Sequence, residues 1–152
     1  MTNEELIKKT TEELLKKMAF DKVTIEIKKS DEPPMLTASI YVDDASQLIG
    51  QGGSNLHDFQ KVLRLLVNKK NPEVISFVVD INGYREKREV FLKELGQEIA
   101  EQVIKTKKPV MLQPMSSYER RVVHLELSKN PEVATESIGE EPERRIVIKP
   151  HL

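Results

Sequence analysis

The sequence contains no cysteine among its 152 residues. The chain therefore cannot form a disulfide framework, and it has no thiolate to act as a nucleophile or to bind a metal. No apolar run reaches the roughly 18 residues that a membrane-spanning helix needs. The first residues read MTNEELIKK, without the apolar stretch of a secretory signal. We therefore expect a cytoplasmic protein with no membrane insertion.

Neither sign of charge is in excess. The 24 Lys and Arg residues are balanced by 25 Asp and Glu residues, so the formal net charge is −1. This balance argues against proteins that bind nucleic acid by bulk positive charge, but it leaves binding through local patches open. The three histidines, His57, His124 and His151, are too few and too scattered for a dedicated zinc site. We predict no metal and no other cofactor.

The first half of the chain changes its hydrophobic period several times. An amphipathic helix with a Thr2–Glu5 capping box is followed by two alternating segments that predict a β-hairpin. A second helical period follows a glycine-rich loop, with Ser54 or Asn55 as its expected cap, and leads to a β-branched strand. The predicted elements are a helix at 3–19, strands at 22–29 and 35–42, a short helix at 45–49, a helix over 56–67 and a strand at 74–80.

The second half is predicted to begin with a long helix at 84–106, whose apolar stripe is Phe91, Leu95, Ile99 and Val103. A second capping box, Ser116 and Glu119, starts another helix. The remaining predicted elements are a strand at 110–112, that helix at 117–128, and strands at 133–137 and 145–149. The fold class is α+β, with two small tandem domains, an αββααβ unit at 1–82 and a small sheet packed on helices at 83–152. Because each core is small, we expect the long helix to pack on both.

The glycine-rich loop lies between two predicted helices and reads Ile49-Gly50-Gln51-Gly52-Gly53. A Gly-x-x-Gly turn at a helix N-terminus presents backbone N–H groups that favour a phosphate. No Lys-Ser/Thr pair follows, so the loop is not a Walker loop. The alternative is a helix–turn–helix corner whose glycines serve only tight packing.

In its context of helix, hairpin, helix and strand, this loop resembles that of a type II KH domain. The resemblance implies a loop that clamps the backbone of about four unpaired nucleotides. The chain departs from the pattern, because Gln51 and Gly52 stand where such loops usually carry Lys or Arg. Lys61 and Arg64 on the next helix could supply the missing cation, or they could belong to an ordinary solvated helix face.

The segment from Tyr118 to His124 is the second concentration of functional residue types. Arg120 and His124 are four residues apart, so a helix places them one turn apart on one face. Arginine offers a planar fork of donors to a phosphate, and histidine can bind a phosphate oxygen or stack on a base. Arg121 and Tyr118 flank the pair, and Tyr118 could stack on a base. The alternative is a surface helix whose arginines pair with nearby glutamates.

Three segments together resemble the R-three-H domain, which binds single-stranded nucleic acid and is named for its Arg-x-x-x-His motif. They are Pro114 to His124, Thr135-Glu136-Ser137-x-Gly139, and Arg144 to Ile148. A KH domain followed by this domain resembles the bacterial Jag (SpoIIIJ-associated) family. By that resemblance Arg120 and His124 are the motif pair, and Arg144, Arg145 and Lys149 extend the basic face.

The resemblance implies a non-catalytic protein that binds single-stranded RNA, or single-stranded DNA, as a post-transcriptional regulator or RNA chaperone. The alternative is a protein-interaction module whose KH half forms a homodimer or pairs with a small KH protein, with little RNA binding of its own. We do not expect an enzyme, because the only candidates for a nuclease centre are Asp43-Asp44, His57-Asp58 and Asp80. The chain also has no nucleophile elbow.

Overall fold

The computed structural model describes residues 1–151, so the last residue of the predicted 83–152 domain lies outside it. The chain divides into two compact units, Met1–Arg85 and Glu86–Leu152. Each unit has its own three-stranded sheet and its own cluster of buried apolar side chains. The predicted α+β class with two small units in tandem is confirmed. No helix within residues 1–151 is both long enough and apolar enough to cross a bilayer.

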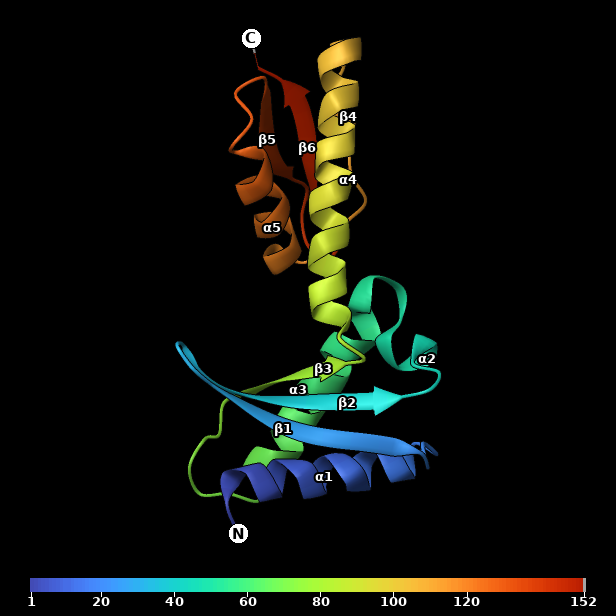
Figure 1. Ribbon diagram of the computed structural model, residues 1–152, viewed down its shortest axis with the longest axis vertical. Helices are drawn as coiled ribbons and strands as arrows, with labels where there is room; N and C mark the ends of the chain where they lie inside the picture. Colours follow the sequence, from blue (N-terminus) through green and yellow to red (C-terminus); the bar gives the residue numbers. More distant parts are fainter. Residues whose placement is uncertain (152) are drawn as a thin grey trace. The chain divides into compact units, whose positions relative to one another are not determined.

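The first unit folds in the order helix, hairpin, two helices, strand (Figure 1). In its sheet β2 is central, β1 pairs with it antiparallel, and β3 pairs with it in parallel. Its elements are α1 (Asn3–Lys17), β1 (Val23–Asp31), β2 (Pro34–Val42), α2 (Ser46–Ile49), the 3-10 turn η1 (Gln51–Gly53), α3 (Ser54–Lys69) and β3 (Phe77–Ile81).

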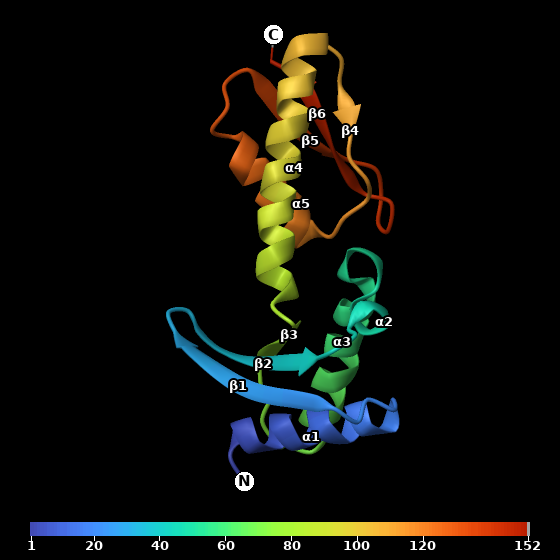
Figure 2. The same cartoon turned by 45° about the vertical axis from the view of Figure 1, so that its right-hand side comes forward.

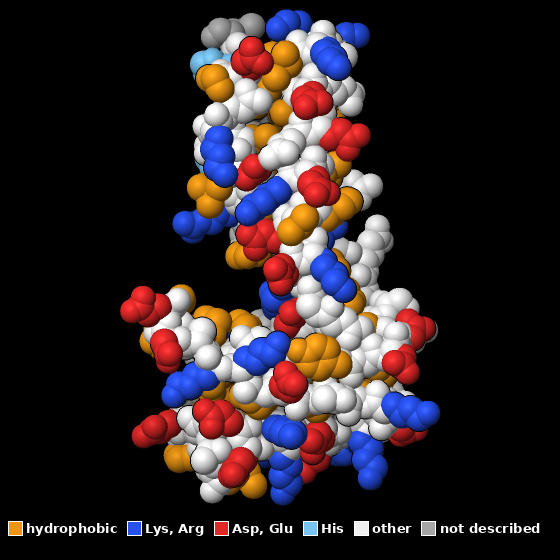
Figure 3. All heavy atoms as spheres, viewed as in Figure 1, with side chains coloured by type: hydrophobic (Ala, Val, Ile, Leu, Met, Phe, Trp, Pro, Cys, Tyr) orange, Lys and Arg blue, Asp and Glu red, His pale blue; other side chains and the backbone are white. Residues whose placement is uncertain are grey.

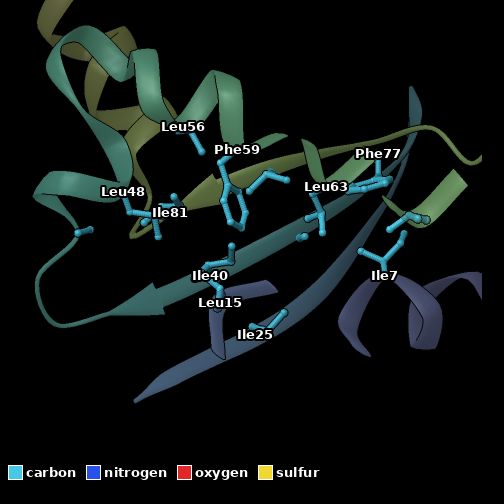
Figure 4. Close-up of a cluster of buried hydrophobic side chains, with 14 of the residues drawn as sticks. Ile7, Leu15, Ile25, Ile40, Leu48, Leu56, Phe59, Leu63, Phe77 and Ile81 are labelled. Carbon is cyan, nitrogen blue, oxygen red and sulfur yellow. The ribbon is translucent and has the colours of Figure 1, made fainter. Parts of the chain in front are cut away.

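One face of this sheet forms the core of the first unit. Alternate strand residues such as Ile25 and Ile40, which are cross-strand partners, are buried with residues from α1 and α3. Figure 4 shows Phe59 and Leu63 of α3 reaching toward β2 in this cluster. The predicted capping box at Thr2 is present and fixes the start of α1.

The third strand begins later than predicted. Instead of extending from residue 74, β3 starts at Phe77. The reason is Asn68, whose Oδ1 accepts a hydrogen bond from Ile75 N at 2.6 Å and whose Nδ2 donates to Ile75 O at 3.3 Å. These bonds take up the backbone groups of Ile75 that a strand would use for ladder pairing.

The second unit contains two helices and an antiparallel sheet in the order β4-β6-β5 (Figure 2). Its buried cluster combines residues of both helices with Ile146 and Ile148 of β6. The first two residues of α4 belong to the first unit, where Tyr84 packs against the core, and the rest of the helix belongs to the second unit. The elements are α4 (Tyr84–Thr106), β4 (Val110–Met111), α5 (Ser117–Leu127), β5 (Val133–Ile138) and β6 (Arg145–Pro150).

The face of α4 that is buried differs from the predicted one. Phe91 is half-exposed and lies under the Arg88 guanidinium, whereas Leu92, Gly96 and Ala100 face the core. The reason is Gly96, where an ideal Cβ would lie 3.7 Å from both Val123 and Leu127 of α5. The small residues on this face let α5 approach closely, a preference that hydrophobic periodicity does not register.

Candidate nucleic-acid interface

The N-terminus of α5 is fixed by two side chains. Ser116 Oγ accepts a hydrogen bond from Glu119 N at 3.2 Å, as the predicted cap requires. The reciprocal half of the capping box is replaced, because the Glu119 carboxylate binds Arg88 Nε of α4 at 3.0 Å. Glu119 is buried, so this ion pair anchors the first turn of α5 on α4.

Arg120 does not present an open fork of donors. The residue is only 9 % exposed. Its Nη1 donates to Met115 O at 2.7 Å, and its Nη2 donates to Glu141 Oε1 at 3.0 Å. Arg120 therefore ties the start of α5 to the segment before it and to the β5–β6 loop.

His124, one turn further along α5, is exposed. Its Nδ1 lies 2.6 Å from Thr135 Oγ1 on β5. This contact orients the imidazole ring and leaves Nε2 without a partner among residues 1–151. Nε2 is therefore the ring nitrogen that a ligand could reach.

Arg121 and Tyr118 are also exposed on α5, and with His124 they are spaced three residues apart. We call Tyr118, Arg121 and His124 the α5 ridge. Arg121 makes no hydrogen bond or ion pair within the described part of the chain, and Tyr118 donates to Glu89 Oε2 at 3.3 Å. A groove of about 230 Å³, lined in part by Tyr118, Arg121 and Leu125, runs between α4 and α5. The ridge thus combines an aromatic ring, a cation and an imidazole, which is the chemistry that contacts unpaired nucleotides.

The predicted basic residues of the last strand do not join this ridge. Arg145 and Lys149 alternate along β6 with Ile146 and Ile148, which are buried against the helices. Since neighbouring strand residues point to opposite faces, Arg145 and Lys149 lie on the sheet face away from α5. Arg144 stands just before β6 and donates from Nη1 to Gly139 O at 2.7 Å.

Both cations on that outer sheet face already have acidic partners. Lys149 Nζ lies 2.6 Å from Glu136 Oε2, and this ion pair lowers the pKa of Glu136. Arg145 Nη2 lies 3.4 Å from Glu143 Oε2. Figure 3 shows the same balance more widely, with basic and acidic side chains interleaved over both units on the visible face.

The glycine loop of the first unit lies between α2 and α3, as predicted. Gly50, Gly52 and Gly53 all have positive φ, at 74°, 62° and 81°. An ideal Cβ at Gly50 would lie 2.6 Å from Asn55 Cγ, and one at Gly53 would lie 2.9 Å from Tyr84 Cε1. The unit's own backbone and packing therefore require glycine at these two positions, whatever else the loop binds.

The predicted cap of α3 is wrong. Neither Ser54 nor Asn55 caps it: Gly53 is the N-cap residue and supplies no side-chain bond. Asn55 instead donates from Nδ2 to Gln47 O at 2.7 Å and so ties α3 to α2. This bond explains why Gly50 has no space for a side chain.

Of the two cations considered for this loop, one is engaged. Arg64 Nε donates to Phe77 O of β3 at 2.8 Å, which makes it part of the fold of the unit. Lys61 is exposed on α3 and has no hydrogen bond or ion pair within residues 1–151. Gln51 is exposed in the loop itself.

Three residues near these sites have structural roles that the sequence patterns did not indicate. Thr135 and Glu141 contact the motif residues His124 and Arg120, and Tyr84 lies against Gly53. Thr135 belongs to one of the segments that resemble the R-three-H domain, which is a usable signal. The partnerships of Glu141 and Tyr84 arise only when the chain folds.

Comparison with protein families gives a match for the second unit. Residues 90–150 match the R-three-H domain, the family whose Arg-x-x-x-His motif stands at Arg120 and His124. These residues form an R-three-H domain. The α5 ridge and the Arg120 contacts both lie within it.

Relatives of this chain extend beyond the R-three-H domain. A Clostridium symbiosum protein named RNA-binding protein KhpB is 36 % identical over 126 residues, which are 83 % of this chain and 57 % of that protein. The Bacillus subtilis protein of the same name is 37 % identical over 108 residues, covering 70 % of this chain and 52 % of that protein. A Lactiplantibacillus plantarum protein, also so named, is 36 % identical over 113 residues, 73 % of this chain and 35 % of the relative. The chain thus spans between about a third and just over half of these proteins.

Proposed function

We propose that this chain binds single-stranded RNA through the α5 ridge of its R-three-H domain. The observation that carries the proposal is the exposed row of Tyr118, Arg121 and His124, in which Arg121 and His124 Nε2 have no partner within residues 1–151. A guanidinium and an imidazole suit phosphate oxygens, and an aromatic ring suits an unstacked base. The relatives that are named RNA-binding proteins support RNA over DNA as the ligand.

We propose that the role is binding without chemistry, as a cytoplasmic post-transcriptional regulator or RNA chaperone of the Jag type. We assign residues 83–152 to the R-three-H domain and residues 1–82 to a type II KH-like domain. Support for the KH-like assignment comes from the αββααβ order, the mixed sheet and the position of Gly50–Gly53 between α2 and α3. In this proposal the ridge supplies most of the affinity, since the loop lacks a cation of its own.

The test is fluorescence anisotropy with a labelled 12-nucleotide oligouridine RNA over a salt series. The variant R121Q/H124Q removes the ridge contacts, and R145Q, on the other sheet face, is its control for loss of an arginine. We expect R121Q/H124Q to weaken binding at least tenfold and R145Q to change it less than twofold, because only a few phosphates are contacted. Equal losses in both variants would show that general charge, rather than the ridge, holds the RNA.

A second candidate function is self-association through the first unit. On α3, Val62 and Leu65 are three residues apart and exposed, with Leu65 73 % exposed. Apolar side chains next to each other on a helix suit a helix of a second copy. Sedimentation of the full chain should show a dimer that L65K dissociates, while V74K, at a residue 87 % exposed outside α3, leaves it intact. A monomer at all concentrations would exclude this function for the chain alone.

A further inference from the structure

The loop between β5 and β6 is acidic, and it contacts three arginines. It spans residues 139–143, GEEPE, and the arginines are Arg120, Arg144 and Arg145. Two of the contacts are ion pairs, between Glu141 Oε1 and Arg120 Nη2 at 3.0 Å and between Glu143 Oε2 and Arg145 Nη2 at 3.4 Å. In the third, a backbone carbonyl of the loop accepts from Arg144. The loop therefore provides oxygen acceptors to cations that a nucleic acid would otherwise meet.

The two partners in the Arg120–Glu141 pair are unequally held. The Arg120 side chain is 10 % exposed, whereas that of Glu141 is 61 % exposed. Arg120 also has a second anchor, the bond from Nη1 to Met115 O. The guanidinium is thus fixed by the fold, and its carboxylate partner can move into solvent with the loss of one surface ion pair.

A carboxylate and a phosphate bind a guanidinium in the same way, through oxygens in the plane of the fork. Glu141 Oε1 therefore stands where a phosphate oxygen would have to bind Nη2. Arg120 is next to Arg121 in the chain and one helical turn from His124, so a strand bound along the α5 ridge passes close to this pair.

We propose that Glu141 is an internal competitor of the RNA phosphate for Arg120 Nη2. Glu141 thereby lowers the affinity of the R-three-H domain for single-stranded RNA, because a bound phosphate must displace it. The inference rests on the proposed function, since it presumes that RNA binds at the α5 ridge. A purely positioning role for Glu141, holding Arg120 in place for the RNA, predicts the opposite sign for its removal.

The chain offers a matched control in the neighbouring residue. Glu140 carries the same charge in the same loop, and its side chain makes no hydrogen bond or ion pair with residues 1–151. E141Q and E140Q each remove one negative charge and keep the size of the side chain. Any long-range electrostatic gain is common to both, so their difference reports the contact with Arg120.

The experiment measures the Kd of the full chain, E141Q and E140Q for the labelled 12-nucleotide oligouridine RNA at 50 and 150 mM salt. We expect E141Q to bind about three- to tenfold more tightly than the wild type, and E140Q to differ from it by less than about twofold. Thermal unfolding of both variants checks that Arg120 remains buried in a folded domain.

The outcomes separate this inference from the proposed function. If the wild type binds but E141Q binds no better than E140Q, or binds more weakly, the competitor role is wrong while the RNA-binding function stands. If neither the wild type nor E141Q binds at 50 mM salt, both are overturned. A gain specific to E141Q supports both.

Discussion

The glycine loop of the first unit and the α5 helix of the second carry the two motifs of this chain, and the two motifs use their residues differently. In the loop, Gly50 and Gly53 are required by contacts with Asn55 and Tyr84, and the nearby Arg64 is bonded to β3. On α5, Arg120 is similarly engaged, but Arg121 and His124 face solvent. The comparison teaches that a motif residue is a candidate ligand contact only when the fold does not already use it.

The largest expected effect concerns the loop. Gly53→Ala should lower the free energy of unfolding of the first unit by about 2–3 kcal/mol, because φ is +81° and the new Cβ meets the Tyr84 ring. Gly83→Ala has a similar φ of +68° with nothing within 4 Å, so its loss of stability should stay near about 1 kcal/mol. Urea unfolding followed by amide NMR signals of residues 1–85 measures both. Equal losses would mean that Tyr84 gives way and that the glycine is not needed for packing.

The next effect tests the division of labour within the Arg-x-x-x-His helix. Arg120→Met should destabilise the R-three-H domain by about 1–3 kcal/mol, because Met115 O loses its buried donor. Arg121→Met, an identical change at the next residue, should stay within about 0.5 kcal/mol because Arg121 is exposed and unpaired within residues 1–151. Thermal unfolding of the two variants decides. Similar losses would show that Arg121 also has a structural role.

A smaller effect asks whether the loop is an incomplete phosphate clamp. Gln51→Lys places a cation where KH loops usually have one, and it should tighten binding of single-stranded RNA about two- to fivefold. Gln102→Lys, an exposed residue of α4, adds the same charge elsewhere and is the control. Anisotropy titrations of both variants give the answer. If the two changes have equal effects, the loop has no RNA contact and the contrast with α5 becomes complete.

Much of this architecture could be predicted from residue patterns. Helix spacing, strand alternation and turn residues gave the element order of both units, because these signals are local. The buried face of α4 was not predictable in this way, since Gly96 and Ala100 face the core through close packing with α5 rather than through hydrophobicity. The start of β3 was missed for a related reason, a side-chain bond from Asn68 that has no sequence signature.

The candidate site divides in the same way. The residue types on α5 indicated contact with single-stranded nucleic acid, and their exposure could be tested only against the fold. The pairing of Arg120 with Glu141 joins residues that lie on different elements, and it changes Arg120 from an open donor into an occupied one. The placement of Arg145 and Lys149 on the far side of the sheet follows from strand alternation once the buried partners Ile146 and Ile148 are known.

The smallest expected effect tests whether Lys149 on that far side is an RNA contact or a local ion-pair partner. Lys149 lowers the pKa of Glu136, so the pair stabilises the folded chain at neutral pH and loses this contribution as the pH falls through the folded pKa of Glu136. In K149Q the pKa of Glu136 should rise toward its ordinary value, which NMR titration of the carboxyl group measures. Wild type and K149Q should then differ slightly in stability at pH 7 and converge in acid. RNA affinity should be nearly unchanged in K149Q, and a loss comparable to that of R121Q/H124Q would extend the RNA interface from the α5 ridge to the outer face of the sheet.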